Sequence, residues 1–350
     1  MAQEIFPDLY RIKIPLPNTP LKYLNSYIIR AEPRSLIVDT GLNHEICLNA
    51  MRGGLAEIGL DLEQADIFVT HLHADHFGLV AKLANDNTRV FFNRPDAEII
   101  ENWQGFEPMI HYATRNGLSD DTLRAALDKH PGRRFGTDWR PPLNILNDGQ
   151  QMEIGRYRFT CVHTPGHTRG HMCLYEPREK FLIAGDHILI DITPNIQCWS
   201  EDGDPLKNYL ESLDKVKTLD VKWVLPGHRR LFNNCRERID ELKGHHARRL
   251  EEVLDILAGQ SPLNAFQIAS QMTWDIKAEN WEAFPPAQMW FATGEAISHV
   301  RYLANSGLIR RITENPVLTY ALADGLARKR EESSPGEEVT PFSAQGRRVA

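Results

Sequence analysis

The chain has 350 residues, of which 42% are hydrophobic and 25% charged, the proportions of an ordinary globular protein with one large domain and a smaller one. No apolar run is long enough to span a membrane, and the formal net charge of −7 argues against an obligate nucleic-acid binder. The five cysteines are scattered and odd in number, and the first residues lack the basic start and apolar core of a secretion signal. We therefore expect reduced thiols in a cytoplasmic protein that does not engage membranes.

The first seventy residues are typical of consecutive strands and one helix. Short β-branched runs bounded by Pro, Gly or Asn predict strands at residues 10–14, 26–30 and 35–41, and an amphipathic helix is predicted at 44–58. Asp39 lies at the end of the third strand. It either orients a ligand histidine or starts a turn, and the sequence leaves both interpretations open.

Four metal-ligand types follow the apolar run 67–69 within six positions, namely His71, His73, Asp75 and His76. His71 and His73 alternate with Leu72, so both imidazoles can point to one side while the leucine points into the core. Imidazole and carboxylate together suit zinc or a similar divalent ion. A lone histidine here would be read as a surface or capping group, but the cluster favours a metal site at the C-terminal end of a strand.

Residues 94–143 change character, with helical stretches between Gly and Pro breaks, and predict a helical insertion. Its apolar cluster includes Trp103 and Tyr112. These side chains either line a substrate mouth or pack the insertion against the sheet, and packing is the commoner outcome for any single residue.

Three later strands end as the first ligand strand does. The runs 157–163, 181–185 and 222–226 are followed by His167, Asp186 and His228, and we expect all four strands to belong to one sheet. His171 either hydrogen-bonds near this site or lies on the next strand. The loop after Asp186 makes two further residues candidates for substrate contact, Asn195 and Trp199.

The set HxHxDH, TPGH, AGD and PGH, between about residues 8 and 235, resembles the metallo-β-lactamase superfamily. The resemblance implies an α/β fold, a four-layer αββα sandwich over residues 1–235 with a metal pair at one sheet edge. It implies three ligands for a first ion, three for a second and one bridging carboxylate: His71, His73 and His167; Asp75, His76 and His228; and Asp186. Two divalent ions, zinc first and iron or manganese as alternatives, would share a hydroxide as the nucleophile. Asp75 and Asp186 would be the catalytic carboxylates.

The C-terminal part of the sequence predicts a linking helix at 236–260, a second domain at 261–325 and a disordered tail at 326–350. In the second domain we expect a helix with Ser261 as N-cap, a longer helix and a hairpin, an order that resembles the winged-helix domain of one branch of the superfamily. Between residues 255 and 324, four basic residues face seven acidic ones. We therefore expect this domain to pack, to form a lid or to join a homodimer, and not to bind nucleic acid.

The function favoured by these features is metal-dependent hydrolysis of a small ester or thioester. The resemblance extends to glyoxalase II-like and acyl-CoA thioesterase members, although the helical glutathione-binding part of glyoxalase II is lacking. The alternative is a metal-dependent ribonuclease or phosphodiesterase, because the same ion pair can cleave a phosphodiester. A non-enzymatic winged-helix binding protein is disfavoured by the complete ligand set.

Overall fold

The structure of the chain is a computed structural model that describes residues 1–17, 19–137, 142–313 and 316–327. The chain forms two compact units, each assembled from several segments. The first contains Met1–Trp103, Pro131–Pro194 and Glu211–Ile239, and the second contains Gln104–His130, Asn195–Leu210 and Asp240–Ala350. The division into consecutive domains stays a prediction, and from residue 328 on the predicted disordered tail lies outside the described residues.

The first unit contains a seven-stranded sheet whose strands follow one another in chain order. Strands β1 to β4 pair antiparallel and β4 to β7 pair parallel. Their bounds are β1 (Ala2–Phe6), β2 (Leu9–Pro15), β3 (Tyr23–Ile29), β4 (Ser35–Val38), β5 (Ala65–Phe68), β6 (Val90–Asn93) and β7 (Leu143–Leu146). The three strands predicted in the first forty residues are β2, β3 and β4.

A second sheet of the same unit has the order β12-β11-β10-β9-β8. Its strands are β8 (Gln151–Ile154), β9 (Tyr157–His163), β10 (Met172–Glu176), β11 (Phe181–Gly185) and β12 (Trp223–Pro226). The prediction that all four ligand-bearing strands share one sheet was therefore wrong, because β5 belongs to the first sheet and β9, β11 and β12 to the second. A polar residue at the end of an apolar run marks where a loop begins, but it carries no information on which strands pair.

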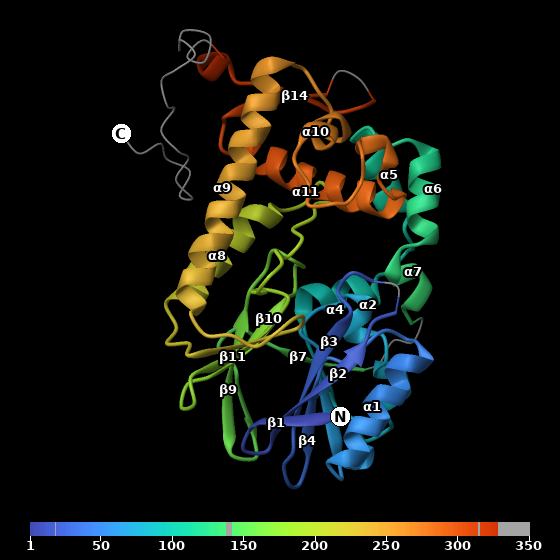
Figure 1. Cartoon of the computed structure of the whole chain (residues 1–350), viewed down its shortest axis with the longest axis vertical. Coiled ribbons are helices and arrows are strands. Elements are labelled where there is room, and N and C mark those ends of the chain that lie inside the picture. The colour runs from blue at the N-terminus through green and yellow to red at the C-terminus, as the bar shows by residue number, and fades with distance from the viewer. Residues whose placement is uncertain (18, 138–141, 314–315, 328–350) are drawn as a thin grey trace. The chain divides into compact units, whose positions relative to one another are not determined.

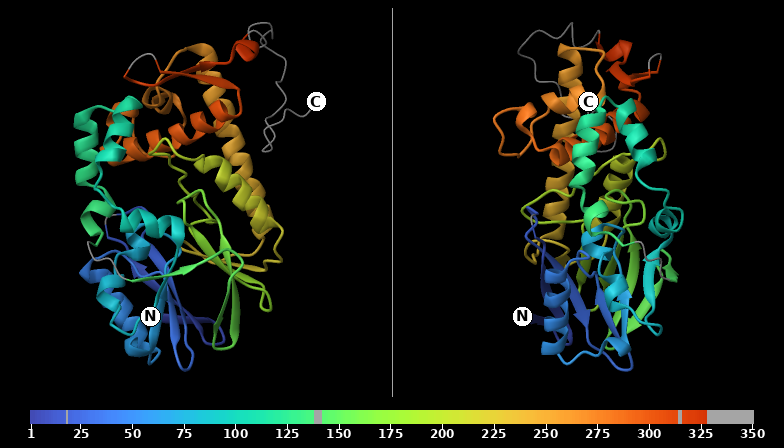
Figure 2. Two further views of the ribbon diagram at one scale, coloured as in Figure 1. Left: turned by 180° about the vertical axis from the view of Figure 1, so that it is seen from behind. Right: turned by 90° about the vertical axis from the view of Figure 1, so that its right-hand side faces the viewer.

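The two sheets lie face to face (Figure 1 and Figure 2). Buried side chains from both sheets form the core between them, among them Tyr27, Phe68, Phe159, Phe181 and Leu225. Each large apolar side chain buried in this way contributes about 2 kcal/mol to folding. The packing places the C-terminal end of β5 beside the loops of the second sheet.

Helix α1 (Glu45–Glu57) covers the outer face of the first sheet (Figure 1). Its buried residues Cys47, Met51 and Leu55 belong to the same apolar cluster as Ile12 of β2. A Cβ on Gly54 would lie 2.6 Å from the Ile12 side chain, so the glycine inside this helix allows it to approach the sheet closely.

The other helices of the first unit are short: η1 (Leu62–Gln64), α2 (Ala74–Phe77), α3 (Val80–Leu83), α4 (Arg94–Glu101) and α7 (Pro131–Phe135). Two longer helices, α8 (Pro205–Lys217) and α9 (Cys235–Gly259), contribute residues to both units. Within the described part of the chain, no helix combines the length and apolar character that crossing a membrane requires.

The second unit is mainly helical, with one two-stranded sheet. It contains α5 (Glu107–Arg115), α6 (Asp120–Asp128), α10 (Ala265–Gln271), η2 (Trp281–Ala283), α11 (Pro286–Asn305), β13 (Ile309–Ile312) and β14 (Thr319–Leu322). The predicted N-cap Ser261 was wrong. Helix α10 begins after Asn264, which forms a reciprocal capping box with Gln267. Serine and asparagine are both good N-caps, but the capping box needs Glu or Gln three residues later, and Gln267 fills that position for Asn264 whereas Asn264 itself stands there for Ser261.

Helix α11 buries an acidic side chain, Glu295, which is 9% exposed. Burial raises the pKa of Glu295 to about 7, although Arg249 acts in the opposite direction. Between the ordinary pKa of a glutamate and about pH 7, Glu295 keeps its proton in the folded chain but has released it in the unfolded chain. The contribution of this group to stability is therefore present at low pH and is lost as the pH rises through this range.

Glu295→Gln is expected to raise the free energy of unfolding at pH 8 by about 2 kcal/mol, because the amide has no charge to bury. At pH 4.5 the gain should vanish. Urea unfolding at both pH values measures the difference, with the exposed Glu282→Gln as the matched control. Equal effects of Glu295→Gln at the two pH values would contradict this description of the buried carboxyl.

Candidate metal centre

The structure brings together all seven side chains that the sequence proposed as metal ligands. They come from the segment after β5, the loop between β9 and β10, and the ends of β11 and β12. The potential ligand atoms form three overlapping groups in which every atom lies within 4.8 Å of the others: His71, His73 and His167; His71, His76 and Asp186; and Asp75, His76 and His228. The three groups overlap, because His71 belongs to two of them and His76 also belongs to two.

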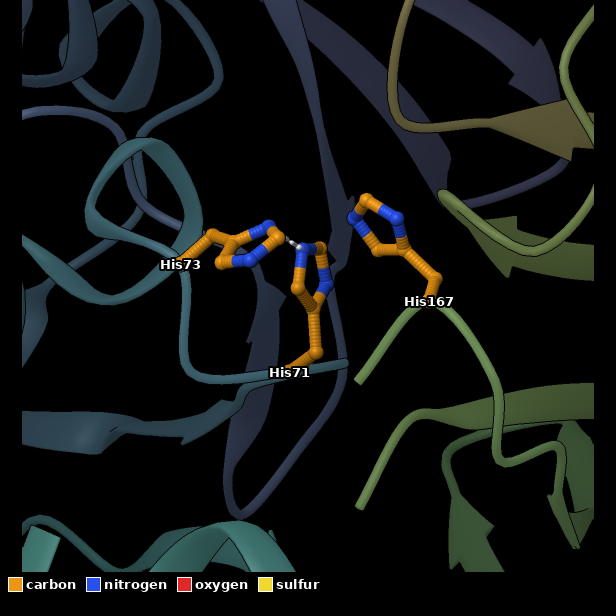
Figure 3. A group of neighbouring side chains, drawn as sticks. All are labelled: His71, His73 and His167. Atoms are coloured by element: carbon orange, nitrogen blue, oxygen red, sulfur yellow. Dashed lines mark hydrogen bonds between the residues drawn. The ribbon is translucent and has the colours of Figure 1, made fainter. Parts of the chain in front are cut away.

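The first group consists of three imidazoles that converge on one point (Figure 3). His71 Nε2 lies 3.0 Å from His73 Nδ1, and the His167 ring meets that of His73 edge-on, with centroids 4.6 Å apart. Burial, followed by the neighbouring His167, lowers the pKa of His73 to about 3. The ring is therefore neutral at physiological pH and offers the lone pair that a metal requires.

The second group combines imidazoles with carboxylates. His228 Nε2 lies 3.3 Å from Asp75 Oδ2 and 3.4 Å from Asp186 Oδ2, and His76 Nε2 lies 3.6 Å from Asp186 Oδ1. Burial alone would lower the pKa of His228, but the Asp186 and Asp75 carboxylates raise it to about 10. This part of the cluster therefore attracts positive charge, which a divalent cation supplies.

Asp186 reaches both groups. Its Oδ2 lies 3.7 Å from His167 Nε2 in addition to its contact with His228. The side chain is 6% exposed, and burial is outweighed by His228 and His76, which hold its pKa well below the usual range. The group is an ionised carboxylate between two sets of imidazoles.

The ring nitrogens that face away from the cluster have fixed partners. His228 Nδ1 lies 2.9 Å from the Tyr23 carbonyl oxygen, which can only accept, so Nδ1 carries the proton. His76 Nδ1 lies 2.8 Å from Asp39 Oδ2, and His71 Nδ1 lies 3.0 Å from Thr70 Oγ1. Such contacts orient metal-binding histidines and fix their tautomers.

Three buried atoms in the cluster have no hydrogen-bond partner among the described residues: His76 Nε2, His228 Nε2 and Asp186 Oδ1. Buried polar atoms are normally satisfied, and a cation bound among these atoms would satisfy them. Gly227 adds to this cradle, because a Cβ there would lie 2.5 Å from Asp186 Oδ1 and 2.9 Å from His76 Cε1. The donor set of imidazole nitrogens and carboxylate oxygens fits one or more divalent transition ions.

His171 contacts the backbone of Asp186. Its Nε2 accepts a hydrogen bond from the Asp186 backbone N–H at 3.1 Å, and its Nδ1 lies 2.8 Å from Thr164 Oγ1. Gly185 has a positive φ of 47°, and a Cβ there would lie 2.7 Å from His171 Nε2. This geometry favours the first of the two interpretations of His171, and the His76–Asp39 contact does the same for Asp39.

Comparison with known proteins identifies the family. A model described as the metallo-beta-lactamase superfamily matches residues 20–228, which is more than half of the chain. The chain belongs to this superfamily. It is 29% identical over 223 residues to the human protein "Acyl-coenzyme A thioesterase MBLAC2", covering 59% of this chain and 74% of that protein. It is 26% identical to "Probable metallo-hydrolase YqjP" of Bacillus subtilis, covering 76% and 85%.

A solved structure has the same fold. The metallo-beta-lactamase family protein TTHA1429 from Thermus thermophilus matches with a TM-score of 0.77 and 29% identity, covering 91% of this chain and all of that one. These findings establish a mixed α/β metallo-β-lactamase fold and a metal-dependent hydrolase of this superfamily.

The four predicted substrate contacts divide between the two units. Trp103 lies in the first and is 42% exposed, whereas Asn195, Trp199 and Tyr112 lie in the second. Tyr112 is 4% exposed and its hydroxyl accepts a hydrogen bond from Arg301, and the Trp199 ring stacks on Trp290 with centroids 4.1 Å apart. Tyr112 and Trp199 thus take part in packing, and all four substrate contacts stay predictions.

Thr70 and Thr164 were not predicted from the sequence to take part in the site. Thr70 Oγ1 donates to Asp39 Oδ2 at 2.8 Å, and Thr164 contacts His171. Both threonines lie between a strand and a ligand loop, and this repeated position was the signal that could have identified them.

Proposed function

We propose that the chain is a dinuclear metal-dependent hydrolase that cleaves small esters or thioesters, with an acyl-CoA thioester favoured and zinc as the first choice of metal. His71, His73 and His167 would hold one ion, Asp75, His76 and His228 the other, and Asp186 would bridge them. When bound, such a pair lowers the pKa of a water molecule and polarises the substrate carbonyl.

The observation that carries this proposal is the position of Asp186, whose carboxylate lies within 4 Å of histidines from both ligand groups. The residues of the chain keep this geometry: Asp39 and the Tyr23 carbonyl hold the far sides of His76 and His228. The backbone N–H of Asp186 is held by His171. Preorganised ligands of this kind lower the cost of ordering the site when the ions bind.

The choice of a thioester is supported by the similarity to acyl-coenzyme A thioesterase MBLAC2. The YqjP similarity supports hydrolysis without naming a substrate. Membership of a glyoxalase II-like branch, a homodimer and a cytoplasmic location are parts of the proposal that rest on the sequence alone.

Two observations weigh against nucleic acid as the substrate. We propose that α10, α11 and the β13–β14 hairpin form a winged-helix-like domain, in which His299 and Arg301 would be the residues offered to phosphates. His299 is fully buried, and Arg301 donates hydrogen bonds to the carbonyl oxygens of Ser200, Glu201 and Gly203. With these groups engaged inside the unit, a packing or lid role is favoured.

A substrate panel tests the proposal. Zinc-reconstituted enzyme is assayed with acyl-CoA thioesters, lactoylglutathione, a phosphodiester and single-stranded RNA, with Asp186→Ala measured in parallel as the control for contaminating activities. We expect turnover of acyl-CoA thioesters to exceed that of the other substrates. Turnover confined to phosphodiesters or RNA would reverse the assignment in favour of a nuclease.

A further inference from the structure

A buried carboxylate outside the ligand set, Asp96, lies in the first turn of α4 and is fully buried. Its Oδ2 accepts hydrogen bonds from the Leu72 backbone N–H at 3.0 Å and from Thr168 Oγ1 at 2.7 Å. Its Oδ1 accepts one from the Gly170 backbone N–H at 2.6 Å. Three donors from two separate loops therefore meet on one side chain.

These donors lie next to the proposed ligands. Leu72 is between His71 and His73, and Thr168 directly follows His167. The first ligand group thus draws two histidines from one loop and one from the other, and Asp96 is hydrogen-bonded to both loops. A shift of either loop relative to Asp96 would change the distances between the three imidazoles.

The absence of a side chain at Gly170 allows its contact with Asp96. A Cβ at that position would lie 2.5 Å from the Asp96 backbone nitrogen and 2.7 Å from its Cγ, so only glycine lets the loop approach the carboxylate this closely. The close approach is a second, independent sign that the loop and Asp96 are fitted to each other.

Burying the charged carboxylate of Asp96 costs free energy. Burial raises the pKa of Asp96 to about 6 in spite of its hydrogen bonds, which shows that the charged form is poorly solvated. An amide is less costly to bury, but its single oxygen cannot accept from the Leu72 and Gly170 amides at once, because these two N–H groups face different carboxylate oxygens. The two acceptor oxygens are what the position requires.

We propose that Asp96 is a positioning residue that holds the two ligand loops at the separation at which His71, His73 and His167 can share one metal ion. The inference rests on the metal centre of the proposed function and not on the choice of substrate. Asp96 acts through the Leu72 and Gly170 amides and the Thr168 hydroxyl, and it does not contact the ion.

The test compares Asp96→Asn with Asp66→Asn. Asp66 is an equally buried carboxylate at the start of β5, where it accepts hydrogen bonds from Arg34 and Arg89, and it contacts neither ligand loop. In Asp96→Asn the amide NH2 faces a backbone N–H whichever way it is oriented, so the hydrogen bond from either Leu72 or Gly170 is lost. We expect the zinc dissociation constant, measured by competition with a chromophoric chelator, to rise about 10- to 100-fold.

Two further readouts separate positioning from general destabilisation. In the apo-protein, hydrogen exchange at the Leu72 or the Gly170 amide should become faster in Asp96→Asn, whereas both amides should exchange at the parent rate in Asp66→Asn. Asp66→Asn should lower the melting temperature yet leave zinc affinity within about threefold of the parent. Because no substrate is used, these measurements are independent of whether the enzyme is a thioesterase.

An unchanged zinc affinity in Asp96→Asn, or an equal loss in Asp66→Asn, would overturn the proposal. If Asp96→Asn does not fold, Thr168→Val provides the test, because it removes one donor and leaves the carboxylate. We expect it to weaken zinc binding at least about threefold, consistent with the loss of one hydrogen bond to a charged group. Parent-like zinc affinity in Thr168→Val would equally overturn the proposal.

Discussion

Asp186→Ala is expected to lower turnover at least about 1000-fold, equivalent to about 4 kcal/mol of transition-state stabilisation, and to remove most of the bound metal. The physical reason is that this carboxylate faces both ligand groups, within 4 Å of His76, His167 and His228. Its loss leaves Asp75 as the only carboxylate among the seven proposed ligands. Steady-state turnover and elemental analysis of the purified variant measure the two effects.

The matched control for this variant is Asp191→Ala. Asp191 follows in the same segment but is exposed, where it pairs with Arg230 on the surface. Exposed ion pairs contribute little, so turnover and metal content should match those of the parent. Retention of both activity and metal in Asp186→Ala would reject the assignment of this residue.

His73→Ala is the second variant with a large expected effect. It removes one of three imidazoles of the first group while Asp186 and the second group remain. We expect turnover to fall about 100-fold or more, and bound metal to be reduced less than in Asp186→Ala. The same turnover assay and elemental analysis apply.

An exposed histidine outside the cluster, His111, supplies the control through His111→Ala. This variant loses the same side chain with no change expected in metal content. A His73→Ala protein with parent-like activity would show that the first group does not hold a catalytic ion.

The local part of the site was predictable from the sequence. His71, His73, Asp75 and His76 lie within six residues after an apolar run, so strand alternation and the turn into a helix define where they point. The AGD and PGH loops were recognisable for the same reason. Each signal is contained in a few consecutive residues.

The contacts that orient these ligands were not predictable in the same way. His228 is fixed by the carbonyl of Tyr23, which is 205 residues away in the chain, and a backbone carbonyl has no sequence signature. Asp96 looks like an ordinary acidic residue in a first helical turn, where its charge suits the helix dipole. Only the packing of α4 against two loops gives it another role.

The pairing of strands also escaped prediction. The end of β5 and the ends of β9, β11 and β12 carry similar patterns, yet they belong to two sheets. The β-branched composition of a buried strand is compatible with either sheet, because each has one face in the shared core. The site is assembled by the packing of the sheets, which no single segment encodes.

The most direct test of the central claim is the metal content of the chain purified without chelators, measured by inductively coupled plasma mass spectrometry beside Asp186→Ala. The seven converging side chains predict about two equivalents of a zinc-class ion per parent chain and a marked loss in the variant. Less than about 0.1 equivalent of any transition ion in the parent, with the same value in Asp186→Ala, would contradict the existence of a metal centre.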